Sequence, residues 1–211
     1  MAPGELDSLD ADRLKPLVQQ LLMRIDDLLA QIKAQNARIA ELVGLPPDAP
    51  HFLQALTHPS YANERRGEQD NQRLEFLGDS VLGLVVTDMA YASFPEMPEG
   101  ELAKLRAAIV NAQALADVAR SLELGSLVRL GKGEEQSGGR DKASILADAL
   151  EAVFGAVYLD RGLDETRRLL ERLFRPLMEA YARGEGDRDY KTILQEPASS
   201  ELHTMPEYHL E

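Results

Sequence analysis

The N-terminal part of the chain has a regular apolar pattern. Spacings of four and three residues alternate along Leu14, Val18, Leu21, Ile25, Leu28 and Ile32. This is the heptad pattern of one helical face. After the polar Gln35 the pattern resumes at Ile39 and Leu42, and Gly44 with Pro46 ends it. We therefore predict a helix over residues 13–44, preceded by a flexible tail of residues 1–12.

Two interpretations of the predicted helix remain open. It is either a coiled coil that helps the chain to dimerise, or an amphipathic helix packed on its own domain. Leu22 and Leu29 widen the apolar stripe, whereas Gln35 breaks it among mostly polar or small neighbours. Because of that break we favour the packed amphipathic helix.

The rest of the chain has helical periodicity over most of its length and no alternating strand pattern. We predict an all-α domain over residues 45–183. Its helices are expected at residues 50–57, 70–93, 99–122, 141–159 and 163–182. The composition becomes linker-like at Gly184, and residues 184–211 are too few to bury a core of their own.

Composition and charge narrow the function classes. The chain has 211 residues with 36 acidic and 23 basic side chains, a net charge of −13, and no cysteine. The absence of cysteine excludes disulfides and thiolate metal sites. No apolar run is long enough to cross a membrane, so we expect a cytoplasmic protein. The negative charge argues against broad, sequence-independent attraction to nucleic acid.

Acidic residues inside apolar helices are the most informative feature. Glu75 and Asp79 are four residues apart, and Asp148 and Glu151 are three apart, so each pair lies on one helical face. Burying a carboxylate is unfavourable unless it is paired or coordinated.

Salt bridges are the ordinary compensation for such buried carboxylates, and the candidate partners are Arg73, Arg106, Arg140 and Lys142. The alternative is a shared Mg²⁺ or Mn²⁺, because hard cations take oxygen ligands. Gly78 and Gly83, two glycines within one helix, favour the metal hypothesis because they suggest close helix approach there.

Several segments together resemble the endonuclease domain of bacterial ribonuclease III over about residues 50 to 180. In family order they are Gln54–Ala62, Gln72–Ser80, Pro98–Arg106, Gly131–Gly139 and Lys142–Ala152. The resemblance implies a homodimer that hydrolyses double-stranded RNA with Mg²⁺, or with Mn²⁺ in its place. It also implies a role in RNA processing such as rRNA maturation. The alternative is a catalytically weak or inactive RNA-binding or ribosome-associated scaffold of the same fold.

The resemblance also assigns roles to single residues. The family's metal ligands fall on Glu75, Asp79, Asp148 and Glu151, of which Asp79 and Glu151 are the catalytic candidates. Supporting positions fall on Gln72 and Glu99. Many members have Glu where this chain has Gln72, so the supporting role of that position is in doubt.

Further candidates lie outside the carboxylates. Phe76 is a candidate dimer anchor, with packing in its own core as the alternative. Lys132, Arg140 and Lys142 are candidate RNA contacts, with ordinary surface charge as the alternative. We interpret His58 as a packing or hydrogen-bonding residue rather than a catalyst.

The last residues resemble the opening of the family's double-stranded-RNA-binding domain. Asp189–Glu196 corresponds to its first helix and Pro206–Tyr208 to the entry of its first strand, but Pro197 interrupts the helix and the basic part is missing. We therefore expect RNA binding that depends strongly on the divalent ion and is weaker than in a full-length relative.

Overall fold

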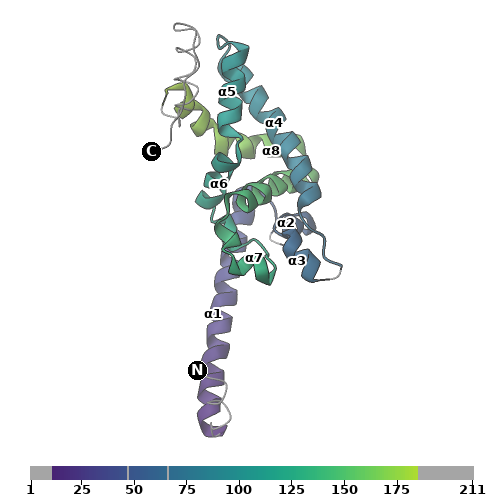
Figure 1. The fold of residues 1–211 in the computed structure, drawn as a ribbon, viewed down its shortest axis with the longest axis vertical. Coiled ribbons are helices and arrows are strands. Elements are labelled where there is room, and N and C mark those ends of the chain that lie inside the picture. The colour runs from purple at the N-terminus through teal and green to yellow at the C-terminus, as the bar shows by residue number, and fades with distance from the viewer. Residues whose placement is uncertain (1–10, 47, 66, 185–211) are drawn as a thin grey trace, which may run out of the picture.

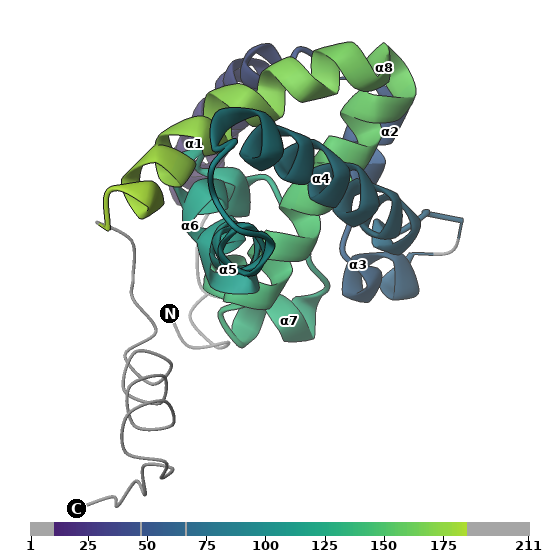
Figure 2. The ribbon, with the colours of Figure 1, turned by 90° about the horizontal axis from the view of Figure 1, so that it is seen from above.

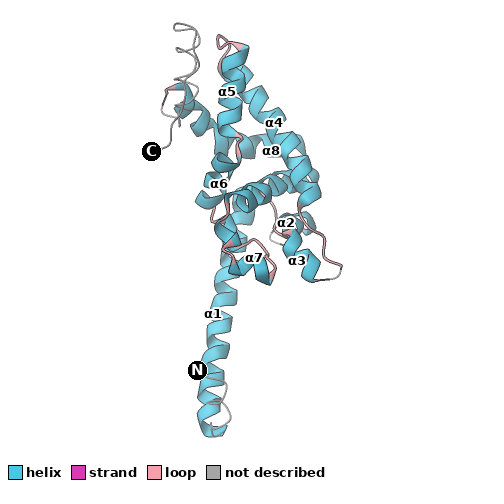
Figure 3. Ribbon diagram, in the orientation of Figure 1, coloured by secondary structure: helices cyan, strands magenta, loops and turns pink. Residues whose placement is uncertain are grey.

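The computed structural model describes residues 11–46, 48–65 and 67–184. Every regular element among these residues is helical (Figure 3), and one isolated bridge joins Thr57 to Arg129. The predicted all-α fold is thus confirmed. The helices are α1 (Ala11–Val43), α2 (Pro50–Ala55), α3 (Pro59–Glu64), α4 (Gln72–Ser93), α5 (Glu99–Ile109), α6 (Ala112–Ser121), α7 (Lys132–Gln136) and α8 (Ala143–Ala182), with short 3₁₀ turns η1 (Leu124–Ser126) and η2 (Gly139–Asp141).

The prediction of one helix over residues 99–122 is wrong. Two helices, α5 and α6, occupy this stretch, and Asn111 separates them. Asn111 has extended backbone angles, and its side-chain oxygen accepts a hydrogen bond from the backbone N–H of Ala114 at 2.9 Å. It is therefore an N-cap, a role that competes with helix continuation. The short helices α3 and α7 were not predicted at all.

Helix α8 forms the centre of the domain, and α4, α6 and α2 pack on it. Its two halves run in different directions (Figure 2), because Gly162 has a φ of 82° that interrupts the helical backbone. The rings of Phe154 and Phe174, one from each half, meet edge to face with centroids 5.9 Å apart. Both rings are fully buried, so this contact holds the bend inside the core.

Helices α4 and α8 touch backbone to backbone. A Cβ placed on Gly78 would lie 1.8 Å from the carbonyl oxygen of Glu151, and one on Gly155 would lie 2.3 Å from that of Leu74. Only glycine fits at these two positions. Gly83 has no atom within 4 Å of such a Cβ, so the expectation of close approach holds at Gly78 and is wrong at Gly83.

Helix α1 extends away from the other helices (Figure 1). Its C-terminal end is anchored: Val43 is buried, as is Leu45 just beyond the helix. The large apolar side chains between Leu17 and Leu29 are exposed. The interpretation that we favoured, a helix packed along its own domain, is therefore wrong for this stretch. The expectations for the N-terminal tail and for the RNA-binding segment concern residues 1–10 and 185–211, which lie outside the described residues.

No helix in the described part of the chain combines the length and the apolar character needed to cross a membrane.

The contact at Gly78 predicts a large effect of a single methyl group. Gly78→Ala should lower the free energy of unfolding by about 3 kcal/mol or more, because backbone atoms of α8 cannot move aside easily. Gly83→Ala is the matched control in the same helix and should raise stability by about 0.5–1 kcal/mol. Thermal unfolding measures both. Equal changes in the two variants would contradict the packing described here.

Candidate metal centre

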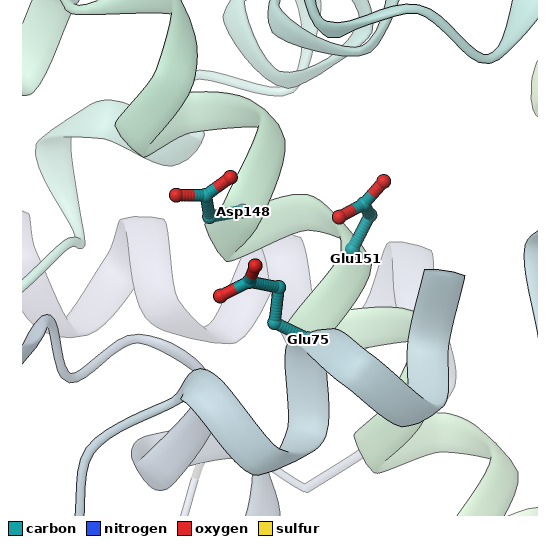
Figure 4. Close-up of side chains that lie close together, drawn as sticks. All are labelled: Glu75, Asp148 and Glu151. Carbon is teal, nitrogen blue, oxygen red and sulfur yellow. The ribbon is translucent and has the colours of Figure 1, made fainter. Parts of the chain in front are cut away.

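Three carboxylates from two helices meet at the contact between α4 and α8. Glu75 lies in the first turn of α4, and Asp148 and Glu151 lie one turn apart on α8. Each offers an oxygen atom, and these atoms lie within 4.8 Å of one another (Figure 4). We call Glu75, Asp148 and Glu151 the carboxylate cluster. The backbone contact at Gly78 and Gly155 brings the two helices close enough for it to form.

The cluster is half-buried, and its charges repel one another. Burial first, and then the charges of Asp79, Asp148 and Glu75, raise the pKa of Glu151 to about 7. Burial and neighbouring carboxylates, Asp148 foremost, also raise the pKa of Glu75. Burial raises the pKa of Asp148, while the charge of His58 acts in the opposite direction. The folded chain thus holds negative charge where it is unfavourable, which a bound cation would relieve.

The salt-bridge interpretation of these carboxylates is wrong. Within the described residues, none of the four proposed partners, Arg73, Arg106, Arg140 and Lys142, forms an ion pair with the cluster or with Asp79, and no lysine or arginine contributes to the pKa shifts of the cluster residues. Three of the four proposed partners bind elsewhere: Arg106 donates to Thr87, Arg140 to Glu135 and Lys142 to Glu134. The cluster has hard oxygen ligands, and none of the lysine or arginine partners expected from the sequence neutralises it, a combination that fits a divalent cation.

Asp79 lies one turn after Glu75 on α4 and is exposed. It is not among the three residues whose oxygens lie within 4.8 Å of one another. Its charge nevertheless raises the pKa of both Glu75 and Glu151, as a carboxylate one turn from Glu75 on the same helix would.

The two supporting residues have different positions. Gln72 is the exposed first residue of α4, one turn before Glu75, and its backbone N–H donates to Asp70 at 3.2 Å. Glu99 begins α5, beyond the C-terminal end of α4. A helix of 22 residues is about 33 Å long, so the chain does not bring its own Glu99 to its own cluster.

His58 precedes α3 and caps it. Its Nδ1 accepts a hydrogen bond from the backbone N–H of Ser60 at 3.2 Å and lies 2.8 Å from the Ser60 hydroxyl. This matches the hydrogen-bonding role that we expected. Sequence analysis did not show that His58 is also close enough to Asp148 to affect its pKa. Nothing in the spacing of these two residues, ninety positions apart, could have indicated this proximity.

The candidate RNA contacts differ in how they are engaged. Arg140 donates from Nη1 to the carbonyls of Gly125, Ser126 and Val128, and from Nε and Nη2 to Glu135. The guanidinium therefore holds this loop together.

The two lysines differ in whether their side chains form contacts within the chain. The Nζ of Lys142 lies 2.5 Å from Glu134 and 3.0 Å from Ser137. Lys132 begins α7, where its backbone N–H donates to Glu64 at 2.8 Å. Its side chain is exposed and forms no ion pair within the described residues.

Phe76 is 77% exposed, so the alternative that it packs in its own core is wrong. Leu84 and Tyr91, at 58% and 74% exposure, follow it along α4. Spacings of eight and seven residues bring all three to one side of the helix. We call Phe76, Leu84 and Tyr91 the α4 apolar face.

The fold and the carboxylate cluster define a class of helical domain that fits a divalent cation between its two central helices. Residues 49–177 match the family described as ribonuclease-III-like, and this chain belongs to that family.

Relatives agree with this assignment. Ribonuclease 3 of Streptomyces coelicolor is 62% identical over 157 residues, which cover 74% of this chain and 57% of that protein. Ribonuclease 3 of Thermobifida fusca is 59% identical over 179 residues, 84% of this chain and 74% of that protein. The nuclease domain of ribonuclease III from Campylobacter jejuni superimposes with a TM-score of 0.59 at 40% identity, covering 65% of this chain and 97% of that domain. The chain thus spans little more than half of the Streptomyces relative.

Because the pKa of Glu151 is raised, we expect the substitution Glu151→Gln to change the stability of the fold in a pH-dependent way. Its pKa of about 7 lies above the ordinary 4.5, so the folded state holds this proton more tightly than the unfolded state. The stabilising effect of this bound proton is fully present below pH 4.5 and is lost as the pH rises through 7. Glu151→Gln should therefore be more stable than the unaltered chain at pH 8 in EDTA, by on the order of 2 kcal/mol after allowance for solvent screening.

At pH 5 this gain should largely disappear, because Glu151 is then protonated in the unaltered chain. Thermal unfolding of both proteins at the two pH values measures the difference. A gain of the same size at pH 5 and pH 8 would contradict the electrostatic origin.

Proposed function

We propose that this chain is the nuclease part of a divalent-metal-dependent endonuclease that hydrolyses phosphodiester bonds of double-stranded RNA. The observation that carries the proposal is the carboxylate cluster, in which three half-buried carboxylates from two helices meet within a ribonuclease-III-like domain. The similarity to proteins named ribonuclease 3 supports the choice of RNA as substrate. Processing of ribosomal and messenger RNA in the cytoplasm is the corresponding cellular role.

Mg²⁺ is the proposed ion, with Mn²⁺ able to replace it. Glu75, Asp148 and Glu151 would hold it, with Asp79 beside them as the fourth ligand candidate. A bound divalent ion supplies an activated water and offsets the charge that develops on the phosphate. The residues fit this role because all their donor atoms are carboxylate oxygens.

Asp79 and Glu151 are the proposed catalytic residues. Asp79 is exposed at the edge of the cluster, where its carboxylate can accept a hydrogen bond from a water next to the RNA phosphate. Glu151 has the most strongly raised pKa of the group, so its carboxylate responds most to an added positive charge. Gln72 can donate its amide hydrogens to water or to a ribose hydroxyl without adding negative charge.

RNA contacts come from the loop that ends at α8. Duplex RNA is recognised mainly by its shape and by phosphate and 2′-hydroxyl contacts, which suits a few basic side chains without base readout. Lys132 is the foremost candidate, because its side chain is exposed and its backbone is fixed by Glu64. Arg140 and Lys142 are largely used in shaping the same loop, so their contribution to RNA binding would be indirect.

A homodimer would place two such sites on one duplex, as cleavage of both strands requires. The α4 apolar face is the proposed interface, with Phe76 as its anchor, because large exposed apolar side chains mark contact surfaces. The nuclease domain of Campylobacter jejuni ribonuclease III is described as having a region involved in dimer formation, which supports a dimer of this chain as well. In such a dimer Glu99 could support only the cluster of the second copy, because it lies far from its own.

The competing proposal, a scaffold that binds RNA without cutting it, is not favoured. A scaffold has no use for unpaired, half-buried carboxylates, and substitutions that remove them would relieve repulsion. This chain keeps all of them, with the pKa of Glu151 raised to about 7.

Cleavage of a long RNA duplex tests the proposed activity. The chain with Mg²⁺ should convert it into short duplex products, and EDTA should abolish them. Asp79→Asn and Glu151→Gln should each lower the rate by at least about a hundredfold, in line with the loss of a catalytic acid or base. Glu179→Gln is the matched control, because Glu179 is exposed on α8 far from the cluster in sequence, and should change little.

Activity and stability of Glu151→Gln, measured together, distinguish a functional carboxylate from a structural one. Loss of activity together with higher stability at pH 8 points to a functional carboxylate, whereas loss of both would point to misfolding. Intact RNA at high concentrations of the unaltered chain would contradict the proposal.

A further inference from the structure

Helix α1 has an apolar stripe that its own domain leaves uncovered. Between Leu17 and Leu29, seven large apolar side chains on this stripe are 43–59% exposed, and the helix extends away from the body (Figure 1). Helices in proteins owe most of their stability to packing of an apolar face. A stripe of this size in water indicates a contact surface.

The register of the stripe indicates what covers it. With Leu14, Leu21 and Leu28 at the d positions of a heptad, Val18 and Ile25 fall at the a positions. β-Branched residues at a and leucine at d favour a parallel, two-stranded coiled coil. The sequence continues the same register through Leu42, so the seam extends over four heptads with one polar interruption.

The residues beside the seam also suit a parallel pair. Leu17 lies at a g position and Leu22 at the e position of the next heptad, so the two would meet across the interface of two parallel copies. Both are exposed in the single chain, at 43% and 55%. Apolar pairs at this place widen the buried stripe where charged pairs would otherwise lie.

We propose that α1 forms a parallel two-stranded coiled coil with α1 of a second copy of this chain. Charge does not oppose self-association: residues 14–33 have three basic and two acidic side chains, so two copies repel little although the whole chain has a net charge of −13. A membrane surface is a poorer match, because Asp26 and Asp27 lie on the polar face and basic residues do not dominate it.

The proposed pairing is independent of the cleavage chemistry and separate from the α4 apolar face. A parallel coiled coil has a two-fold axis along its length, the symmetry that a homodimer of the nuclease domain would also have. Val43 and Leu45 are buried in the domain, so the coiled coil would be attached firmly at its base.

Disulfide trapping in the full-length chain tests the proposal, since the natural sequence contains no cysteine that could interfere. In a parallel pair, identical d positions lie within reach of a disulfide, so Leu21→Cys and Leu28→Cys should each give a covalent dimer under mild oxidation. Met23→Cys is the matched control: Met23 is 68% exposed but lies on the opposite side of α1. It should cross-link at least about ten times more slowly.

Two further measurements complete the test. Ile25→Lys should weaken self-association in sedimentation velocity, whereas Met23→Lys, the same kind of change outside the seam, should not. Sedimentation with phosphatidylglycerol vesicles examines the membrane alternative. The proposal is overturned if Leu21→Cys and Leu28→Cys cross-link no faster than Met23→Cys, or if Ile25→Lys abolishes vesicle binding while leaving self-association unchanged.

Discussion

The contact between the backbones of α4 and α8 is the constraint on which the rest of the domain depends. At Gly78 and Gly155 the two helices approach more closely than any side chain would permit. Glu75 and Asp79 flank Gly78 on one helix, and Glu151 is the residue whose carbonyl lies against it from the other. The same contact therefore packs the core and fixes the distance between carboxylates of two helices. Stability and the chemistry of the site are coupled at this point.

At the same contact, the burial and mutual repulsion of carboxylates destabilise the folded state. The carboxylate cluster is half-buried, and burial first, with repulsion from the neighbouring carboxylates second, raises the pKa of Glu151 to about 7. Packing that forces like charges together is unfavourable unless something of opposite charge is part of the functional state. This also changes the meaning of the net charge of −13. Part of it is concentrated where a divalent ion is proposed to bind, so it does not argue against an RNA substrate.

The sequence was sufficient to predict the fold class, the acidic helices and the resemblance to the family. Carboxylates in apolar helices are a local signal, and so is helical periodicity. The structure was needed where the outcome depended on contacts distant in sequence. No local feature distinguishes Gly78, which meets α8, from Gly83, which meets nothing. Likewise, only the folded loop shows that Arg140 holds the carbonyls of Gly125 and Val128.

Two further predictions were wrong, the single helix over residues 99–122 and the packing of α1 along its own domain. Asn111 caps α6, and residues 101–122 contain neither proline nor glycine, so the periodicity of residues 99–122 concealed a helix boundary. For α1, the heptad pattern predicted an apolar stripe but could not show whether the domain would cover it. The buried anchors, Val43 and Leu45, lie at the end of the helix, and the stripe continues beyond the body.

Binding of Mn²⁺, followed by electron paramagnetic resonance, tests the central claim most directly. The claim is that Glu75, Asp148 and Glu151 form one cation site. Asp148→Asn should weaken Mn²⁺ binding by at least about tenfold, as the loss of a charged ligand implies. Glu179→Gln should bind as the unaltered chain does, since Glu179 is exposed and outside the cluster. Equal affinity of the unaltered chain and Asp148→Asn would contradict the account.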